Sequence, residues 1–174
     1  MTTQQEKTTQ ALQYAIQMEI DGKVFYTKAS RESGNELGKK LLASLAEQED
    51  YHRMKFEQIF ENLRKSHNWP MVDFKADGGK TLRTIFAIET NKPAPQVKVA
   101  QTELDAVQKA MEMEDKSYDL YHDRYEQAAG TERDYYDKIA AEEREHKLVL
   151  LDYFEFLHNP AAWYVKAEKP LLEI

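Results

Sequence analysis

Cysteine is absent from this 174-residue sequence. Its absence excludes disulfide bonds, iron–sulfur clusters, thiolate metal sites and cysteine nucleophiles. Any metal site must therefore use carboxylate oxygens and imidazole nitrogens as ligands, which restricts the metals that it would favour.

Long apolar runs and runs of basic residues are also missing. No stretch of about 18 apolar residues occurs, and the N-terminal residues 1–7 lack the apolar core of a secretion signal. The net charge of -7 and the pI near 5.3 would repel phosphate groups. We therefore expect a cytoplasmic protein that binds neither a membrane nor nucleic acid.

The residues that are present predict a helical protein. With 41% hydrophobic and 32% charged residues, the composition is ordinary for a soluble globular protein, and one domain covering residues 1–174 is expected. Four long segments place apolar residues at helical spacing, and no segment reads as a strand. These predicted helices cover residues 9–31, 36–65, 102–128 and 131–158.

Short motifs predict where the helices begin and end. Ser33-Gly34-Asn35 supplies residues that stop the first helix and cap the second. Thr102 with Asp105, and Thr131 with Asp134, resemble capping boxes that open the third and fourth helices.

The connections between the helices predict the topology. Short loops after the first and third helices imply two antiparallel hairpins, and residues 67–101 are long enough to return along the bundle. An apolar stretch from Leu82 to Ile88 within this crossover favours a small helix. We expect an all-α four-helix bundle, about residues 9–158, and a short C-terminal tail, residues 159–174. The tail residues Trp163 and Tyr164 would cover the bundle end or contact a second subunit.

An internal repeat relates the two hairpins. Residues of the first helix recur in the third at a constant separation, as in Met18 with Met113 and Tyr26 with Tyr121. The second and fourth helices match in the same way. A duplicated hairpin predicts a site with approximate twofold symmetry.

The repeat carries two copies of a Glu-x-x-His motif, Glu49 with His52 and Glu143 with His146. Residues three apart share one face of a helix, and both pairs lie on the apolar stripe that faces the core. A single glutamate interrupts the stripe of each remaining helix. Six polar side chains therefore converge in an apolar interior: Glu19, Glu49, His52, Glu114, Glu143 and His146.

Two further pairs share this spacing, Glu155 with His158 and Asp119 with His122. Each pair lies on a different side of its helix from the apolar stripe, and neither has an equivalent pair in the other hairpin. We predict that both lie on outer faces and bind no metal.

Metal binding compensates most simply for four buried carboxylates. An unpaired buried carboxylate costs several kcal/mol, and four facing one another repel. Two divalent ions would balance their charge, with one imidazole on each ion. Oxygen-rich coordination with one nitrogen per ion favours iron, with manganese as the alternative. Tyr26 and Tyr121 lie two turns from Glu19 and Glu114, where they would hydrogen-bond the carboxylates, carry electrons or form an aromatic core layer.

This ligand pattern resembles that of the ferritin-like di-iron carboxylate proteins, and the chain resembles their rubrerythrin branch. The resemblance covers about residues 9–158 and implies a ferritin-like fold with two iron ions. It further implies that Glu49 and Glu143 bridge the ions, that Glu19 and Glu114 are terminal ligands, and that His52 and His146 each bind one ion.

The sequence departs from the rubrerythrin pattern in two places. Rubrerythrins carry a cysteine-ligated rubredoxin domain, which a sequence without cysteine cannot form, so an external electron donor such as a rubredoxin-like protein is implied. They also carry a further carboxylate three residues after the third-helix ligand, where this sequence has Ser117. The resemblance also implies a homodimer.

Three functions are compatible with the sequence. The first is a redox enzyme, in which the di-iron centre reacts with peroxide or dioxygen and is reduced again by the external donor. The second is a ferroxidase or an iron-binding and buffering protein. The third is a metal-free bundle that acts as an interaction module.

Overall fold

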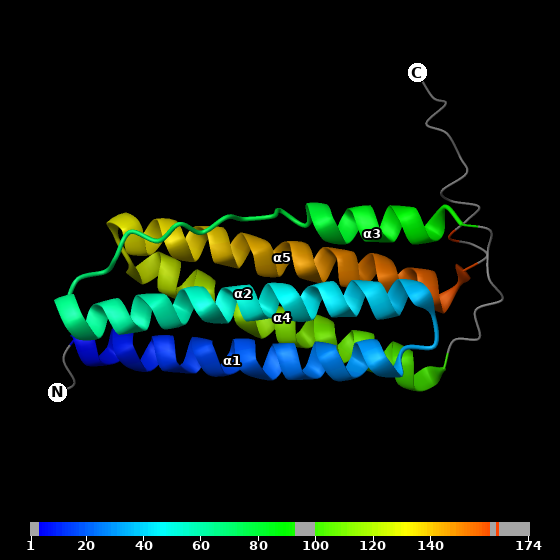
Figure 1. Ribbon diagram of the computed structural model, residues 1–174, viewed down its shortest axis with the longest axis horizontal. Helices are drawn as coiled ribbons and strands as arrows, with labels where there is room; N and C mark the ends of the chain where they lie inside the picture. Colours follow the sequence, from blue (N-terminus) through cyan, green and yellow to red (C-terminus); the bar gives the residue numbers. More distant parts are fainter. Residues whose placement is uncertain (1–3, 93–99, 161–162, 164–174) are drawn as a thin grey trace, which may run out of the picture.

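The computed structural model describes residues 4–92, 100–160 and 163, and the regular structure within these ranges is entirely helical (Figure 1). The five helices are α1 (Gln4–Glu32), α2 (Glu36–Ser66), α3 (Lys80–Thr90), α4 (Gln101–Gln127) and α5 (Gly130–His158). The predicted all-α class is confirmed, and α3 lies where the apolar stretch of the crossover predicted a short helix.

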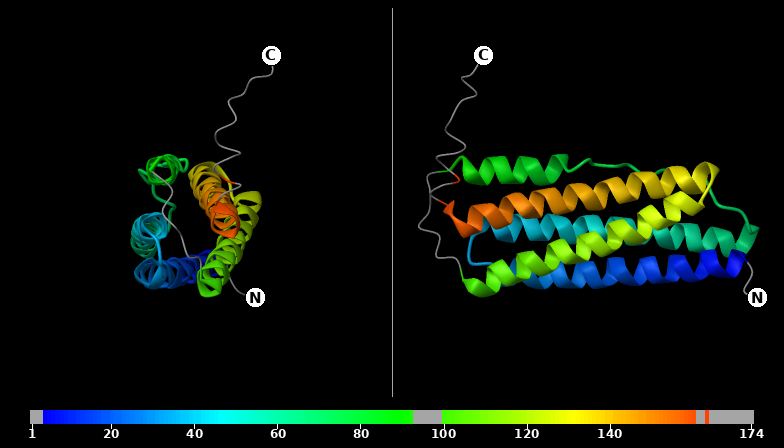
Figure 2. Two further views of the ribbon diagram at one scale, coloured as in Figure 1. Left: turned by 90° about the vertical axis from the view of Figure 1, so that its right-hand side faces the viewer. Right: turned by 180° about the vertical axis from the view of Figure 1, so that it is seen from behind.

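Four long helices form the bundle, and α3 lies against its outside. The hairpin of α1 with α2 faces the hairpin of α4 with α5, and α2 and α4 run in the same direction (Figures 1 and 2). The crossover returns along the bundle and places α3 against α2 and α5. This is the ferritin-like arrangement of two antiparallel hairpins with one crossover.

The helix ends only partly follow the predicted caps. Asn35 caps α2 as expected, with its side-chain oxygen accepting a hydrogen bond from the Gly38 amide at 2.8 Å. Both predicted capping boxes are wrong, because Ala100 and Ala129 occupy the cap positions of α4 and α5 without a side-chain cap bond. Thr102 and Thr131 already lie inside the first turns.

A buried hydrogen-bond cluster explains the early start of α4. The Glu103 carboxylate accepts hydrogen bonds from Asn35 Nδ2 at 3.0 Å, from the Tyr153 hydroxyl at 2.8 Å and from Ser33 Oγ. These donors come from the α1–α2 turn and from α5, so Glu103 fixes the first turn of α4 against both. Tertiary contacts, rather than a local capping box, therefore set this boundary.

Two apolar clusters fill the bundle on either side of a polar layer. One contains Leu41, Leu45 and Leu150 near the α1–α2 turn, and the other contains Leu12, Phe56 and Ile139 toward the opposite end. Full burial of each such side chain stabilises the fold by about 1.5–3 kcal/mol. The helices are thereby held rigidly around the polar layer between the clusters.

The prediction for the C-terminal tail can be compared with the structure at Trp163. Trp163 packs edge-on against Phe86 of α3, with ring centroids 5.3 Å apart. This contact places Trp163 against the first apolar cluster, whereas Tyr164 lies outside the described residues. The interpretation that the tail covers the bundle end therefore has support at Trp163.

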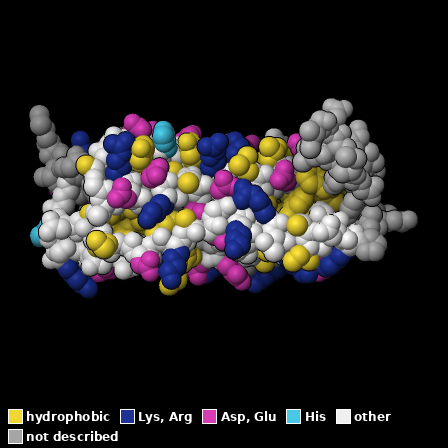
Figure 3. Space-filling view, turned by 90° about the horizontal axis from the view of Figure 1, so that it is seen from above, with side chains coloured by type: hydrophobic (Ala, Val, Ile, Leu, Met, Phe, Trp, Pro, Cys, Tyr) yellow, Lys and Arg dark blue, Asp and Glu magenta, His cyan; other side chains and the backbone are white. Residues whose placement is uncertain are grey.

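The described surface is mixed in charge. Basic and acidic side chains are interspersed on the face that carries the crossover and α3 (Figure 3). Within the ranges described, no helix is long and apolar enough to cross a membrane.

Candidate metal centre

The polar layer brings together all six residues that the sequence analysis singled out. Each hairpin contributes one glutamate from its first helix and a glutamate with a histidine from its second. These residues are almost completely buried, none being more than 4% exposed. The six are Glu19 on α1, Glu49 and His52 on α2, Glu114 on α4, and Glu143 and His146 on α5.

The six residues form two overlapping groups of four. In each group, one oxygen or nitrogen atom from every residue lies within 4.8 Å of the others. Glu49 and Glu143 belong to both groups, so their carboxylates lie between the other members. Glu19 and His52 complete one group, and Glu114 and His146 complete the other.

The histidine rings turn the same nitrogen toward the carboxylates. His52 Nδ1 lies 3.2 Å from Glu143 Oε1 and 3.5 Å from Glu19 Oε2. His146 Nδ1 lies 3.4 Å from Glu49 Oε1 and 3.5 Å from Glu114 Oε2. The two rings are nearly parallel, with centroids 5.5 Å apart. Each imidazole therefore presents one ring nitrogen to its own group.

Many inward-facing atoms of this layer lack a hydrogen-bond partner among the described residues. They are Glu19 Oε2, Glu49 Oε1, both carboxylate oxygens of Glu143, His52 Nδ1 and His146 Nδ1. Buried polar atoms are normally satisfied, and a cluster of unsatisfied acceptors facing one point is the arrangement that cations stabilise. The residues therefore fit a pair of metal ions.

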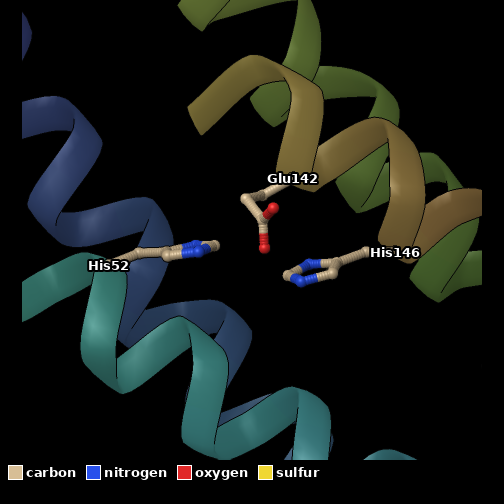
Figure 4. Close-up of side chains that lie close together, drawn as sticks. All are labelled: His52, Glu142 and His146. Atoms are coloured by element: carbon tan, nitrogen blue, oxygen red, sulfur yellow. The ribbon is translucent and has the colours of Figure 1, made fainter. Parts of the chain in front are cut away.

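The outer sides of the imidazoles meet a different pair of residues. His146 Nε2 lies 3.0 Å from the amide oxygen of Gln48. One oxygen of Glu142 lies within 4.8 Å of a ring nitrogen of His52 and of one of His146, and Figure 4 shows its carboxylate pointing between the two rings. Such partners orient a metal-binding imidazole and tune its basicity.

Glu142 also ties this layer to the crossover. Its carboxylate accepts hydrogen bonds from the Asp77 amide at 3.1 Å and the Gly78 amide at 2.7 Å. Gln48 and Glu142 occupy equivalent positions in the repeat, directly before Glu49 and Glu143. The two halves of the site therefore differ by one negative charge at this position.

Two tyrosines link the hairpins across the site. The Tyr26 hydroxyl on α1 donates to Glu114 on α4, and the Tyr121 hydroxyl on α4 donates to Glu19 on α1. Both rings are fully buried within the apolar clusters. Each tyrosine therefore has both structural roles: its hydroxyl binds a carboxylate, and its ring belongs to the aromatic core.

Burial and mutual repulsion shift the protonation of the four carboxylates. Burial raises the pKa of Glu19 and Glu49 above the ordinary range and that of Glu114 to about 8, and repulsion from neighbouring carboxylates adds to this. Burial opposes ionisation of Glu143 as well, but attraction to the neighbouring imidazoles of His146 and His52 outweighs it and lowers the pKa of Glu143.

The two further pairs with the Glu-x-x-His or Asp-x-x-His spacing lie outside the site, as predicted. Glu155, His158, Asp119 and His122 are all exposed on the outer faces of α5 and α4. Spacing alone did not distinguish them from the ligand candidates, whereas their position relative to the apolar stripe did.

Sequence reasoning missed Gln48, Glu142 and Gly22. An ideal Cβ at Gly22 would lie 2.5 Å from Glu49 Oε2, so only glycine leaves room for this carboxylate. The internal repeat contained a signal for the other two, since both precede a Glu-x-x-His motif directly. Their role depends on which ring nitrogen faces outward, which the sequence does not encode in any local pattern.

The fold and this layer define a class of protein, a ferritin-like helical bundle with a buried carboxylate and histidine cluster compatible with a di-iron site. The family model for rubrerythrin matches residues 10–153. The chain therefore belongs to the rubrerythrin family. Comparison with curated proteins and comparison with solved structures gave no match.

Proposed function

We propose that the protein is a di-iron oxidoreductase that reduces peroxide or dioxygen with electrons from an external donor. The observation that carries this proposal is the pair of overlapping four-residue groups sharing Glu49 and Glu143. Shared carboxylates between two ion positions suit a bridged pair of metals rather than two independent sites.

The donor set supports iron, with manganese as the alternative metal. Glu49 and Glu143 would bridge the ions, Glu19 and His52 would complete one position, and Glu114 and His146 the other. Two divalent ions balance the four carboxylates when all are ionised. When bound as ferrous ions, the metals would supply the two electrons that hydrogen peroxide needs, with two protons, to form two molecules of water.

The protein's own groups would prepare the site for this chemistry. Tyr26 and Tyr121 hold Glu114 and Glu19 in place through their hydroxyls, and each hydroxyl carries a proton close to the centre. Gln48 fixes the orientation of the His146 ring so that its Nδ1 faces inward. The two apolar clusters cover the layer at both of its ends along the bundle.

The donor and the assembly are part of the same proposal. The 174 residues contain no cysteine, so a thiolate-ligated electron carrier is not among them, and a rubredoxin-like protein would supply the electrons. We propose a homodimer, which light scattering of the purified protein would test against a monomer or a larger assembly.

Anaerobic titration with ferrous iron, followed by peroxide or oxygen and monitored by absorbance, tests the function. The wild type should bind about two ions per chain, and its absorbance should change when the oxidant converts the bound iron to the ferric state. Glu114→Ala removes a donor and should bind fewer ions, whereas Glu112→Ala, on the exposed side of the same helix, should match the wild type. An iron-loaded protein that neither oxidant oxidises would refute the proposal.

The same titration distinguishes the proposed oxidoreductase from the alternative, a ferroxidase or iron-buffering protein. A redox enzyme should stop after about two oxidised ions until a donor is added, and then resume. Continued oxidation of added ferrous iron without any donor would indicate iron handling instead.

A further inference from the structure

A cavity of about 150 Å³ between α1 and α4 reaches the proposed metal centre. Glu49 and Glu114 lie at its inner end, together with Tyr26. We propose that this cavity, the twofold pocket, binds small neutral alkyl hydroperoxides and presents their O–O bond to the centre. The inference rests on the proposed function and names the substrate class of that site.

The pocket exists because both helices carry small residues at equivalent positions. Gly22 on α1 and Ser117 on α4 correspond in the internal repeat and both line the pocket. Gly22 has no side chain, and the hydroxymethyl group of Ser117 is short. A Cβ at Gly22 would lie 2.5 Å from Glu49 Oε2, so a larger residue there would extend toward that carboxylate. The pocket is thus lined by equivalent residues of both hairpins, which is the reason for its name.

The walls of the pocket favour an apolar substituent. Met18 and Met113, a second equivalent pair, line it together with Tyr14, whose side chain is 60% exposed. Methionine side chains adapt readily to the shape of an apolar ligand. Pockets with apolar walls and a few convergent polar groups are typical of small-molecule sites.

Charge and volume narrow the ligand further. Asp21 and Lys116 line the pocket with opposite charges, which gives it no preference for an ionic ligand. A water molecule takes up about 30 Å³ of liquid, so hydrogen peroxide alone would leave most of the pocket unfilled. A four-carbon alkyl group on the peroxide would occupy the remainder.

A second cavity, of about 300 Å³ between α4 and α5, also reaches Glu114 and Glu143. Its lining is more charged, because Lys147 and Asp115 form an ion pair at 2.5 Å there. An apolar substituent would have to displace water from these charges, which is unfavourable. The twofold pocket is therefore the better match for an alkyl group.

The reaction balances with the proposed metals. The O–O bond of ROOH breaks, takes up two electrons and two protons, and yields ROH and water. Two ferrous ions held by the six residues would supply these two electrons, one from each ion. The alkyl group stays in the pocket throughout, and the alcohol leaves by the same opening.

Stopped-flow oxidation of the anaerobic di-ferrous protein tests the proposal, with hydrogen peroxide and tert-butyl hydroperoxide as the oxidants. In Met113→Phe, which narrows the pocket, the tert-butyl hydroperoxide rate should fall about tenfold while the hydrogen peroxide rate changes less than twofold, as expected for steric discrimination in an apolar pocket. Met54→Phe, at an exposed methionine of α2, should change neither rate.

The outcomes distinguish this inference from the function that underlies it. Oxidation by hydrogen peroxide alone would overturn the inference and leave the function standing. Equal effects of Met113→Phe on both oxidants would also overturn it. If neither peroxide oxidises the wild type, the function fails and the inference fails with it.

A binding measurement on the unsubstituted protein tests the pocket even if a variant misfolds. Protein labelled with ¹³C in its methionine methyl groups and loaded with zinc would be titrated with tert-butanol, the product of the reaction. The signals of Met18 and Met113 should shift, whereas those of the exposed residues Met54 and Met71 should not. Unmoved signals from Met18 and Met113 would overturn the proposal.

Discussion

At the scale of single residues, the polar layer also depends on groups outside the six residues predicted as ligands. Gly22 provides room for the Glu49 carboxylate, and Glu142 supplies a charge beside the imidazoles. The ligand candidates were predictable because a carboxylate or a histidine on an apolar stripe breaks a strong periodic pattern. A glycine on that stripe, or a polar residue beside it, breaks no pattern, which is why neither was given a role from the sequence.

Gly22→Ala should disturb the site without unfolding the bundle. The added Cβ would lie 2.5 Å from Glu49 Oε2, so the carboxylate must move away from its shared position. We expect metal affinity to fall about 10- to 100-fold, measured by competition with a chelator, with helical circular dichroism unchanged. Ser117→Ala, the equivalent position without a clash, is the control, and unchanged affinity in Gly22→Ala would contradict the assignment.

Glu142→Gln tests the charge beside the imidazoles. The substitution removes the anion and leaves only one side-chain acceptor for the Asp77 and Gly78 amides. Metal affinity should fall about 10- to 100-fold, again by chelator competition. In the double variant Gln48→Glu/Glu142→Gln, the charge is exchanged between the halves, and affinity should recover in part. No effect in either variant would show that the charge is irrelevant to binding.

At the scale of helices, the periodic patterns predicted which helices exist and in what order better than they predicted where each helix begins and ends. The apolar stripes identified all four long helices and the small helix of the crossover. The cap predictions failed where contacts distant in sequence determine the first turn, as Glu103 does for α4. A capping box is a local signal, and a buried carboxylate with donors from two other elements outweighs it.

Glu103→Ala should therefore destabilise the junction of the hairpins. It removes the acceptor for Asn35 and for the buried Tyr153 hydroxyl, and an unsatisfied buried donor costs about 1–3 kcal/mol. Urea unfolding should show a loss of this size. Glu112→Ala, exposed on the same helix, should stay within about 0.5 kcal/mol of the wild type. Equal stability of the two variants would refute a structural role for Glu103.

At the scale of the whole molecule, the fold was predictable because the sequence repeats one hairpin. Two short loops and one long connection leave few ways to assemble four amphipathic helices. The rubrerythrin resemblance predicted from the motifs is confirmed by the family match over residues 10–153. What the sequence could not provide is the space between the hairpins, because cavities depend on packing that no periodic pattern describes.

Metal removal should make the stability of the whole bundle depend on pH. Burial raises the pKa of Glu114 from 4.5 to about 8, and the pKa values of Glu19 and Glu49 also rise. Such groups hold their protons more tightly in the folded chain, so their contribution to stability is lost as pH increases above 4.5. Although burial opposes it, attraction to the surrounding carboxylates raises the pKa of His52 and His146, whose contribution to stability is likewise lost as pH rises.

Calorimetry of the metal-free protein should accordingly give a thermal midpoint that falls between pH 5 and pH 8. Glu143, the remaining carboxylate of the layer, has a lowered pKa and adds no slope in this range. Anaerobic ferrous iron should raise the midpoint most at pH 8, because metal ions replace protons at the ionised carboxylates. A midpoint independent of pH and of metal would contradict this account of the polar layer.

The equivalence of the two hairpins has a consequence for how such a site can arise. Each hairpin carries one lone glutamate and one Glu-x-x-His motif, which is half of the six donors. A shorter ancestral chain with a single hairpin would have possessed the complete set as soon as two copies associated. Joining the copies through a crossover would then let each vary separately, and the two halves of this chain differ at the equivalent pairs Gln48 with Glu142 and Gly22 with Ser117.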